Sequence, residues 1–165
     1  MIGYLRGVLR ARTEEGILVD VGGVGYEVAV SATTAAALPS LGREAALFVH
    51  TQVREDAISL FGFHEADERL AFRALLEVNG VGPRLALAVL SSFGPRALAQ
   101  ALATGDVRRL TAVPGIGRKT AERMVLELRD KLPSALEPGY GAIPTPGESA
   151  GEAIVASDTL LPQIA

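Results

Sequence analysis

Two short glycine-containing segments carry the clearest binding chemistry in this chain of 165 residues. Residues 75–91 (LLEVNGVGPRLALAVLS) align with residues 110–126 (LTAVPGIGRKTAERMVL) when the sequence is shifted by 35 positions. Each copy has an apolar helix end, a Gly-x-Gly turn, a basic residue two positions later and a new helix. Glycine permits a tight turn, and the following helix presents unpaired N–H groups at the positive end of its dipole. Each segment is therefore predicted to hold an anion such as a phosphate oxygen.

The residues predicted to contact phosphate occupy matching stretches of the two copies. They are Asn79, Gly80, Val81, Gly82 and Arg84 in the first copy, and Gly115, Ile116, Gly117, Arg118, Lys119 and Thr120 in the second. Backbone amides at 81–84 and 116–119 are expected to hold the oxygen, and the neighbouring cation strengthens the contact. Because every nucleotide carries the same phosphate, such contacts would not read base sequence.

This repeat resembles the helix-hairpin-helix motif, and two copies in tandem resemble the DNA-binding unit built from a pair of them. A turn that only joins packed helices is the alternative, and the matching flanks of the two copies weigh against it. The string at 115–120, GIGRKT, also resembles part of a nucleotide-binding phosphate loop. That loop needs four residues between its first glycine and its Gly-Lys-Thr element, so we expect no ATPase activity.

The charge of the chain is unevenly distributed. Residues 75–132 carry 9 basic and 5 acidic groups, whereas residues 1–74 carry 7 and 10, and residues 133–165 carry 0 and 4. The formal net charge of -3 therefore hides a basic middle segment. Such asymmetry is expected when one surface meets a polyanion, although a solvated helical surface can give the same count.

Several classes of protein are disfavoured by composition. The chain has no cysteine and only two histidines, so we expect no disulfide, no metal site and no cofactor. Arg6 and Arg10 interrupt the stretch that a signal peptide would need to be apolar. No uncharged run is long enough to span a bilayer, and a cytoplasmic protein without membrane contact is expected.

The elements that must position the two turns divide into three segments, an α+β multidomain organisation. Residues 1–63 contain short strand-like runs and one helix capped by Ser31, which predicts a small closed barrel of the OB-fold type. Residues 64–133 have helical spacing, with Gly105 ending one helix, Asp106 starting the next and Pro133 ending the last. Residues 134–165 predict a flexible linker or tail, with one short helix at 151–161.

The glycine cluster Gly22, Gly23 and Gly25 invites comparison with a dinucleotide-binding fingerprint. That fingerprint requires a helix directly after the glycines, whereas the strand-like run YEVAV follows here. A hairpin turn between two strands is therefore predicted.

The chain resembles the RuvA family over residues 1–133. The resemblance rests on four segments in this order: MIGYLRG, VREDAISLFGF, NGVGPRLAL and PGIGRKTAER. The resemblance implies a subunit that has no catalytic site and belongs to an ATP-dependent branch-migration helicase complex acting in recombination, DNA repair and the SOS response. It implies binding of Holliday junction DNA by a homotetramer, or an octamer of two tetramers, with the RuvB ATPase hexamer and the RuvC resolvase as partners. Glu55 and Asp56 match the family's acidic pin, and Arg54 would contact DNA beside it. By residue type alone these two acids are ordinary turn residues.

Residues 134–165 depart from the family pattern, which has a small three-helix domain there that contacts RuvB. The segment looks too short and irregular for that domain, so we expect it to be truncated or divergent, or to have lost the part that recruits RuvB. The alternative function is a helix-hairpin-helix DNA repair enzyme, a glycosylase or nuclease. Such an enzyme needs a catalytic Asp or Lys or a carboxylate metal cluster, and neither can be assembled from the sequence. A third hypothesis is an interaction protein whose glycine turns serve packing only.

Overall fold

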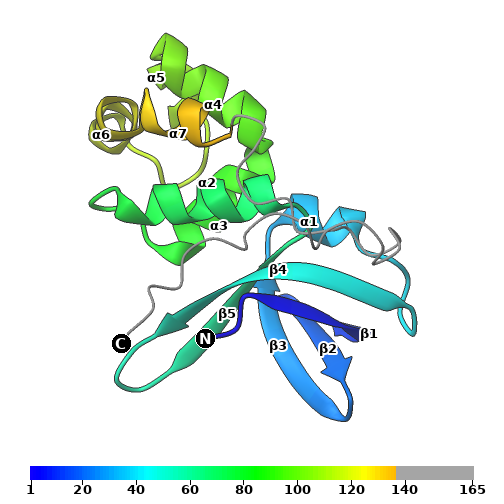
Figure 1. The fold of residues 1–165 in the computed structure, drawn as a ribbon. Coiled ribbons are helices and arrows are strands. Elements are labelled where there is room, and N and C mark those ends of the chain that lie inside the picture. The colour runs from blue at the N-terminus through cyan, green and yellow to red at the C-terminus, as the bar shows by residue number, and fades with distance from the viewer. Residues whose placement is uncertain (137–165) are drawn as a thin grey trace, which may run out of the picture.

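The computed structural model describes residues 1–136 and places a five-stranded barrel below a group of helices (Figure 1). The barrel comprises β1 (Tyr4–Arg12), β2 (Ile17–Val21), β3 (Val24–Val30), α1 (Ala32–Ala37), β4 (Glu44–Val53) and β5 (Ile58–Phe63). The helices are α2 (Ala66–Glu77), α3 (Pro83–Ser92), α4 (Pro95–Thr104), α5 (Val107–Thr111), α6 (Arg118–Leu128) and α7 (Lys131–Ala135). The α+β organisation predicted from the sequence is confirmed. Residues 137–165, with the predicted short helix at 151–161, lie outside the described residues.

The barrel closes in the strand order β1-β2-β3-β5-β4, with β4 returning to pair with β1. All pairs are antiparallel except β3 with β5, where only two residue pairs run in parallel. Alternating side chains such as Leu9, Val19 and Leu47 point into the barrel and are almost completely buried. This alternation is the period-2 pattern that predicted strands in the sequence.

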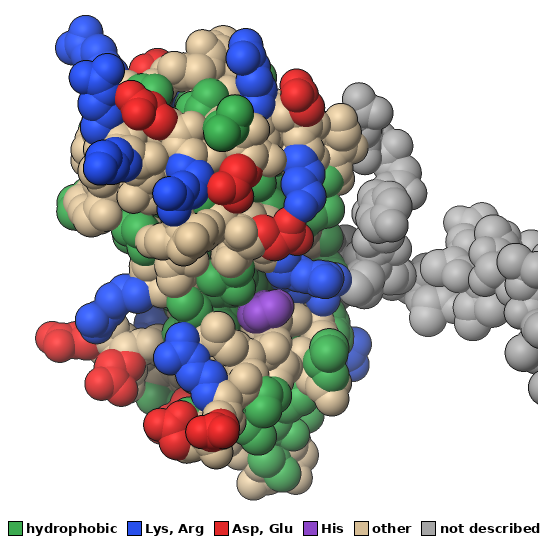
Figure 2. All heavy atoms as spheres, turned by 90° about the vertical axis from the view of Figure 1, so that its left-hand side faces the viewer, with side chains coloured by type: hydrophobic (Ala, Val, Ile, Leu, Met, Phe, Trp, Pro, Cys, Tyr) green, Lys and Arg blue, Asp and Glu red, His purple; other side chains and the backbone are tan. Residues whose placement is uncertain are grey.

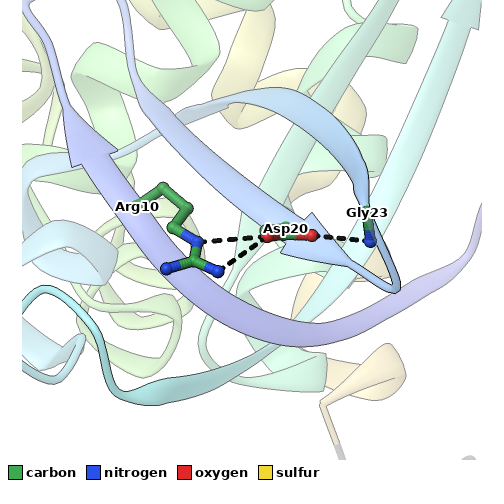
Figure 3. A network of polar contacts seen from close by, with 3 residues as sticks. All are labelled: Arg10, Asp20 and Gly23. Carbon is green, nitrogen blue, oxygen red and sulfur yellow. Dashed lines mark hydrogen bonds and ion pairs between the residues drawn. The ribbon is translucent and has the colours of Figure 1, made fainter.

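The predicted hairpin turn at the glycine cluster is confirmed between β2 and β3. Gly22 and Gly23 have φ of +62° and +92°, as the two central residues of a type I′ turn require. The Asp20 carboxylate accepts a hydrogen bond from Gly23 N at 2.8 Å and is paired with the guanidinium of Arg10 (Figure 3). These contacts lower the pKa of Asp20, the backbone hydrogen bond being the larger cause. The cluster is therefore a structural turn.

The predicted helix boundaries are confirmed at three positions. Ser31 caps α1 by accepting from Thr34 N at 3.0 Å, and Asp106 caps α5 by accepting from Arg109 N at 3.1 Å. Gly105 ends α4 in the left-handed conformation, with φ of +68°. Each side-chain cap satisfies a backbone N–H that has no partner within the helix.

The prediction for the last helix is wrong. The sequence predicts one helix that ends at Pro133, whereas α6 ends at Leu128 and a separate α7 contains Pro133. Proline is tolerated there because it occupies the first turn of α7, where backbone N–H groups have no helical partner.

The barrel and the helices share a core. Phe63 of β5 and Phe72 of α2 are both fully buried, with ring centroids 4.9 Å apart, and Phe61 lies 5.1 Å from Phe72. Aromatic contacts at these distances add to the stabilisation from burial alone. The strands β4 and β5, which form one long hairpin, are therefore anchored directly against the helical module.

Candidate nucleic-acid interface

The two Gly-x-Gly turns have nearly identical backbones. Gly80 and Gly115 have φ of +93° and +92°, a region that disfavours any residue with a Cβ. Gly82 and Gly117 cap the following helices with φ of -91° and -82°. The 35-residue repeat in the sequence is therefore a repeat in three dimensions.

The internal hydrogen bonds of the two turns also match. Val81 N donates to Val78 O at 3.0 Å, and Ile116 N donates to Val113 O at 3.1 Å. The side chains of Val81 and Ile116 are buried, with 6% and 5% of their surface exposed. These two residues anchor their turns in the core, and their amides are engaged inside the turn.

These internal hydrogen bonds reduce the set of backbone amides that could hold a phosphate oxygen, because the amides of Val81 and Ile116 are already occupied. In the first copy, Pro83 has no N–H, so the outward donors are the amides of Gly82 and Arg84. In the second copy, the amides at 117–119 occupy the equivalent positions. No backbone carbonyl among residues 1–136 accepts from Gly82 N or Gly117 N. The amides at these turns that have no partner within the described residues therefore lie at the first turns of α3 and α6, the kind of position at which helices can bind anions.

Gly82 and Gly117 face open space. A Cβ built on either residue would meet no atom within 4 Å, and both have φ values that other residues adopt readily. The fold itself therefore does not require glycine at these two positions. Glycine at an N-cap leaves room for an external group to approach the backbone closely. Gly94 before α4 is equally open, so the openness permits binding, and the repetition of the whole turn is what favours it at these two positions.

The cations beside the turns differ in how they are held. Arg84 and Lys119 are exposed, whereas the Arg118 guanidinium lies 2.8 Å from the Glu122 carboxylate one helical turn away. The hydrogen bond to Glu122 raises the pKa of Arg118 and offsets its charge locally. Lys119 therefore has its charge available for an anion, and Arg118 has less. Thr120 is only half-buried at the start of α6.

Asn79, which is predicted to contact phosphate, makes a contact within the protein that the sequence did not predict. Its backbone carbonyl oxygen accepts a hydrogen bond from Arg123 Nη1 of α6 at 3.1 Å. Arg123 was not among the predicted site residues, because it lies far from the first turn in sequence and its spacing carries no signal. It links the first turn to the helix that starts at the second.

The β4–β5 hairpin carries the residues predicted as an acidic pin. Arg54 N donates to Ala57 O at 2.8 Å across the tip, and Glu55 and Asp56 between them are exposed. Within the described part of the chain neither carboxylate makes an ion pair. The tip is therefore a concentrated negative charge on an extended arm.

The hairpin tip lies on the same side of the molecule as α6 and the turn between α2 and α3, the left side in Figure 1. Figure 2 shows this side facing the viewer. Lys and Arg side chains are spread over its upper, helical part, interspersed with acidic ones, and acidic side chains gather at the lower left over the barrel. One face thus carries mixed charge over the helices and a group of acidic side chains over the barrel.

The described residues offer no candidate metal centre. They contain no group of three or more His, Asp or Glu side chains close enough to hold a metal ion. Asp106 is occupied as a helix cap, and Glu122, the acid nearest the second turn in sequence, is paired with Arg118. No single helix in residues 1–136 is long and apolar enough to span a membrane; α3 and α4 would pass together by length and composition but bend by 95°.

The fold and the paired turns define a tandem helix-hairpin-helix protein with an N-terminal barrel of the OB type. Residues 1–62 match the family model described as the RuvA N terminal domain, and residues 72–130 match that of a SAM-like helix-hairpin-helix tandem. The chain belongs to the RuvA family.

Its relatives include three proteins named Holliday junction branch migration complex subunit RuvA. The protein from Aromatoleum aromaticum is 51% identical over 160 residues, which cover 97% of this chain and 80% of that protein. The one from Anaeromyxobacter is 48% identical, covering 87% of this chain and 77% of the relative. The one from Rubrobacter xylanophilus is 55% identical, covering 79% and 67%.

Proposed function

We propose that this chain binds four-way Holliday junction DNA by structure and not by base sequence, as a non-catalytic subunit of a branch-migration complex. The observation that carries the proposal is the pair of matched turns, in which Gly82 and Gly117 leave the backbone open to an external group. Amide donors and adjacent cations at such turns suit phosphate, and phosphate contacts carry no base information. The name shared by the relatives supports the choice of a four-way junction.

The acidic hairpin tip supplies the structural selectivity in this proposal. A carboxylate about 4 Å from a phosphate is repelled by roughly 1 kcal/mol in water and about 4 kcal/mol at an intermediate effective dielectric. A continuous duplex that crossed Glu55 and Asp56 would meet this repulsion, whereas a junction has an opening at its centre. Arg54 beside the tip would hold a neighbouring phosphate and offset part of the repulsion.

Partners and assembly form the finer part of the proposal. A homotetramer, or an octamer, would place several tips around one junction centre and recruit the RuvB ATPase hexamer, with RuvC in the wider complex. We place this activity in the cytoplasm, in recombination, repair and the SOS response. Mass measurement of junction complexes with and without RuvB tests stoichiometry and recruitment together, and a single protein chain per junction would contradict the assembly.

Gel-shift titration tests the binding proposal. A four-way junction should bind far more tightly than linear duplex of equal length, and affinity should fall steeply with salt because phosphate binding releases counterions. Equal affinity for the two DNAs would contradict the proposal. Incubation of the protein with junction, nicked and damaged DNA plus magnesium should give no cleavage, and a cut product would favour a repair enzyme.

A further inference from the structure

The barrel and the helical module meet along a polar seam at α1. Ala32 N donates to Ser91 Oγ at 2.9 Å, and Thr33 Oγ1 donates to the Leu90 carbonyl at 2.9 Å. Both contacts join the start of α1, which belongs to the barrel, to the C-terminal end of α3. Adjacent residues of α1 thus make directional bonds to the helical module.

The next residue of α1 contacts a buried carboxylate. Thr34 Oγ1 donates to Glu68 Oε2 at 2.8 Å, and His64 N donates to the same oxygen at 3.1 Å. Thr34 is 0% exposed and Glu68 is 3% exposed. One oxygen of Glu68, on α2, therefore binds both the barrel helix and the segment that connects the two modules.

This arrangement is not explained by stability alone. The other oxygen of Glu68, Oε1, is buried and has no hydrogen-bond partner within residues 1–136. A buried carboxylate with an unsatisfied oxygen costs free energy, and an apolar side chain of similar size is often at least as stable at such a site. Buried polar groups are nevertheless retained in some proteins because their directional bonds specify one arrangement of the parts they join. The seam therefore fits an orienting role better than a stabilising one.

The parts that the seam orients are the two halves of the interface. Glu55 and Asp56 extend from the barrel, whereas the turns at 78–82 and 113–117 belong to the helical module. Repulsion of a phosphate depends on its distance from the carboxylates, so it depends on the angle between the modules.

We propose that the seam of Thr33, Thr34, Glu68 and Ser91 holds the acidic tip at a fixed angle to the phosphate-binding turns, so that these positioning residues help to determine the preference for junctions. This inference rests on the proposed function. It assigns the preference to the seam as well as to the tip.

A distance measurement tests the positioning directly. Because the chain contains no cysteine, spin labels can be placed by Ala57→Cys on the hairpin tip and Ala112→Cys beside the second turn. Dilution with unlabelled protein keeps the measured distances within one chain. The distribution should be narrow in the parent chain and in Thr34→Ser, which keeps the hydroxyl, and broader in Thr34→Val, which keeps the shape but loses the donor. Equal widths in all three would overturn the proposal.

A second variant guards against failure to fold. The pair Thr33→Val with Ser91→Ala removes the outer seam contacts at exposed positions, where substitutions are tolerated. It too should broaden the distribution while its thermal midpoint stays near that of the parent. An unchanged distribution in this folded variant would equally overturn the proposal.

DNA binding separates this inference from the proposed function. The ratio of junction to duplex affinity should fall in Thr34→Val towards that of the variant with Glu55→Gln and Asp56→Asn, because a tip held at variable angles repels a duplex less. In a background with Glu55→Gln and Asp56→Asn, Thr34→Val should cause no further fall. An equal fall in both backgrounds would show that the seam does not act through the tip. A parent protein without junction preference would instead contradict the proposed function.

Discussion

Arg123 Nη1 donates to the carbonyl oxygen of Asn79 at 3.1 Å, which ties α6 of the second hairpin to the turn of the first. A reciprocal contact comes from Leu85 of α3, whose Cδ1 lies 3.1 Å from the position that a Cβ on Gly115 would occupy. Each turn is therefore touched by a residue from the other copy. The two turns form one unit with a fixed separation.

We expect Arg123→Met to loosen the first turn and leave the second unchanged. The variant keeps the apolar stem but loses the donor, a contact worth about 1 kcal/mol. Hydrogen exchange of the Val81 amide should become about fivefold faster, because that amide is bonded within the first turn. The Ile116 amide, bonded in the same way in the second turn, is the internal control. Equal acceleration at both amides would show that the contact does not act locally.

The four glycines of the turns should divide into two pairs, one that matters for stability and one that matters for DNA binding. Gly80→Ala or Gly115→Ala forces a side chain into positive φ and should lower the free energy of unfolding by about 1–2 kcal/mol. Gly82→Ala or Gly117→Ala should change stability by less than about 1 kcal/mol, because the backbone is ordinary and the space is open.

The second pair should nevertheless weaken DNA binding, since the new methyl group would occupy the place of the phosphate. Urea unfolding and gel-shift titration of the same preparations separate the two effects. Full DNA affinity in a folded Gly82→Ala, Gly117→Ala double variant would place the bound DNA elsewhere.

The cations at the second turn should differ in their contribution. Lys119→Ala should weaken every DNA substrate alike and reduce the slope of log affinity against log salt by about 0.9. Arg118→Ala should have a smaller effect, because the Arg118 charge is already paired with Glu122. Titrations at several salt concentrations measure both slopes, and a larger loss for Arg118→Ala than for Lys119→Ala would reverse the assignment.

Neutralising the acidic residues of the hairpin tip should raise the affinity for linear duplex DNA. With Glu55→Gln and Asp56→Asn, linear duplex should bind about fivefold more tightly for each repulsion of about 1 kcal/mol removed. The hairpin between β1 and β2 offers a matched control, because Glu14 and Glu15 are also adjacent, exposed and acidic. Glu14→Gln with Glu15→Gln should leave duplex affinity unchanged. An equal gain in duplex affinity from both double variants would show that the effect comes from net charge and not from the position of the tip.

Stability should fall in mild acid because of His50. This ring lies against Phe72, with centroids 5.5 Å apart, and its pKa is lowered first by burial and then by the charges of Arg73 and Arg69. The unfolded state therefore binds the proton more readily, and stability is lost as pH falls below the ordinary histidine value. His50→Phe should flatten the dependence of urea midpoint on pH between about pH 8 and pH 5. A parallel dependence in the variant would exclude His50 as the cause.

Local signals in the sequence predicted most of the elements and the two turns. Ser31, Gly105 and Asp106 act through residues within four positions of themselves, so their roles follow from short-range patterns. The glycine turns were predictable because the same local pattern occurs twice. Pro133 misled the prediction because its effect depends on where a helix begins, and the break after Leu128 has no strong sequence signal.

Contacts between distant segments were not predictable. Arg123 meets Asn79 across 44 positions, and Thr34 meets Glu68 across 34. A buried glutamate in the first turn of a helix resembles an ordinary exposed one in sequence, because acidic residues are common there for electrostatic reasons. Only the packing of α1 on α2 and α3 reveals that Glu68 is enclosed.

The backbone donors at Gly82 and Gly117 affect how easily DNA could move along the protein. If each turn holds a phosphate as proposed, advancing the DNA by one nucleotide brings an equivalent oxygen to the same amide. The binding free energy before and after the step is then equal, whatever the base sequence. Contacts of this kind would let a motor move any DNA sequence through the complex with the same energy at each step. Side chains matched to particular bases would instead slow the movement at the sequences that they prefer.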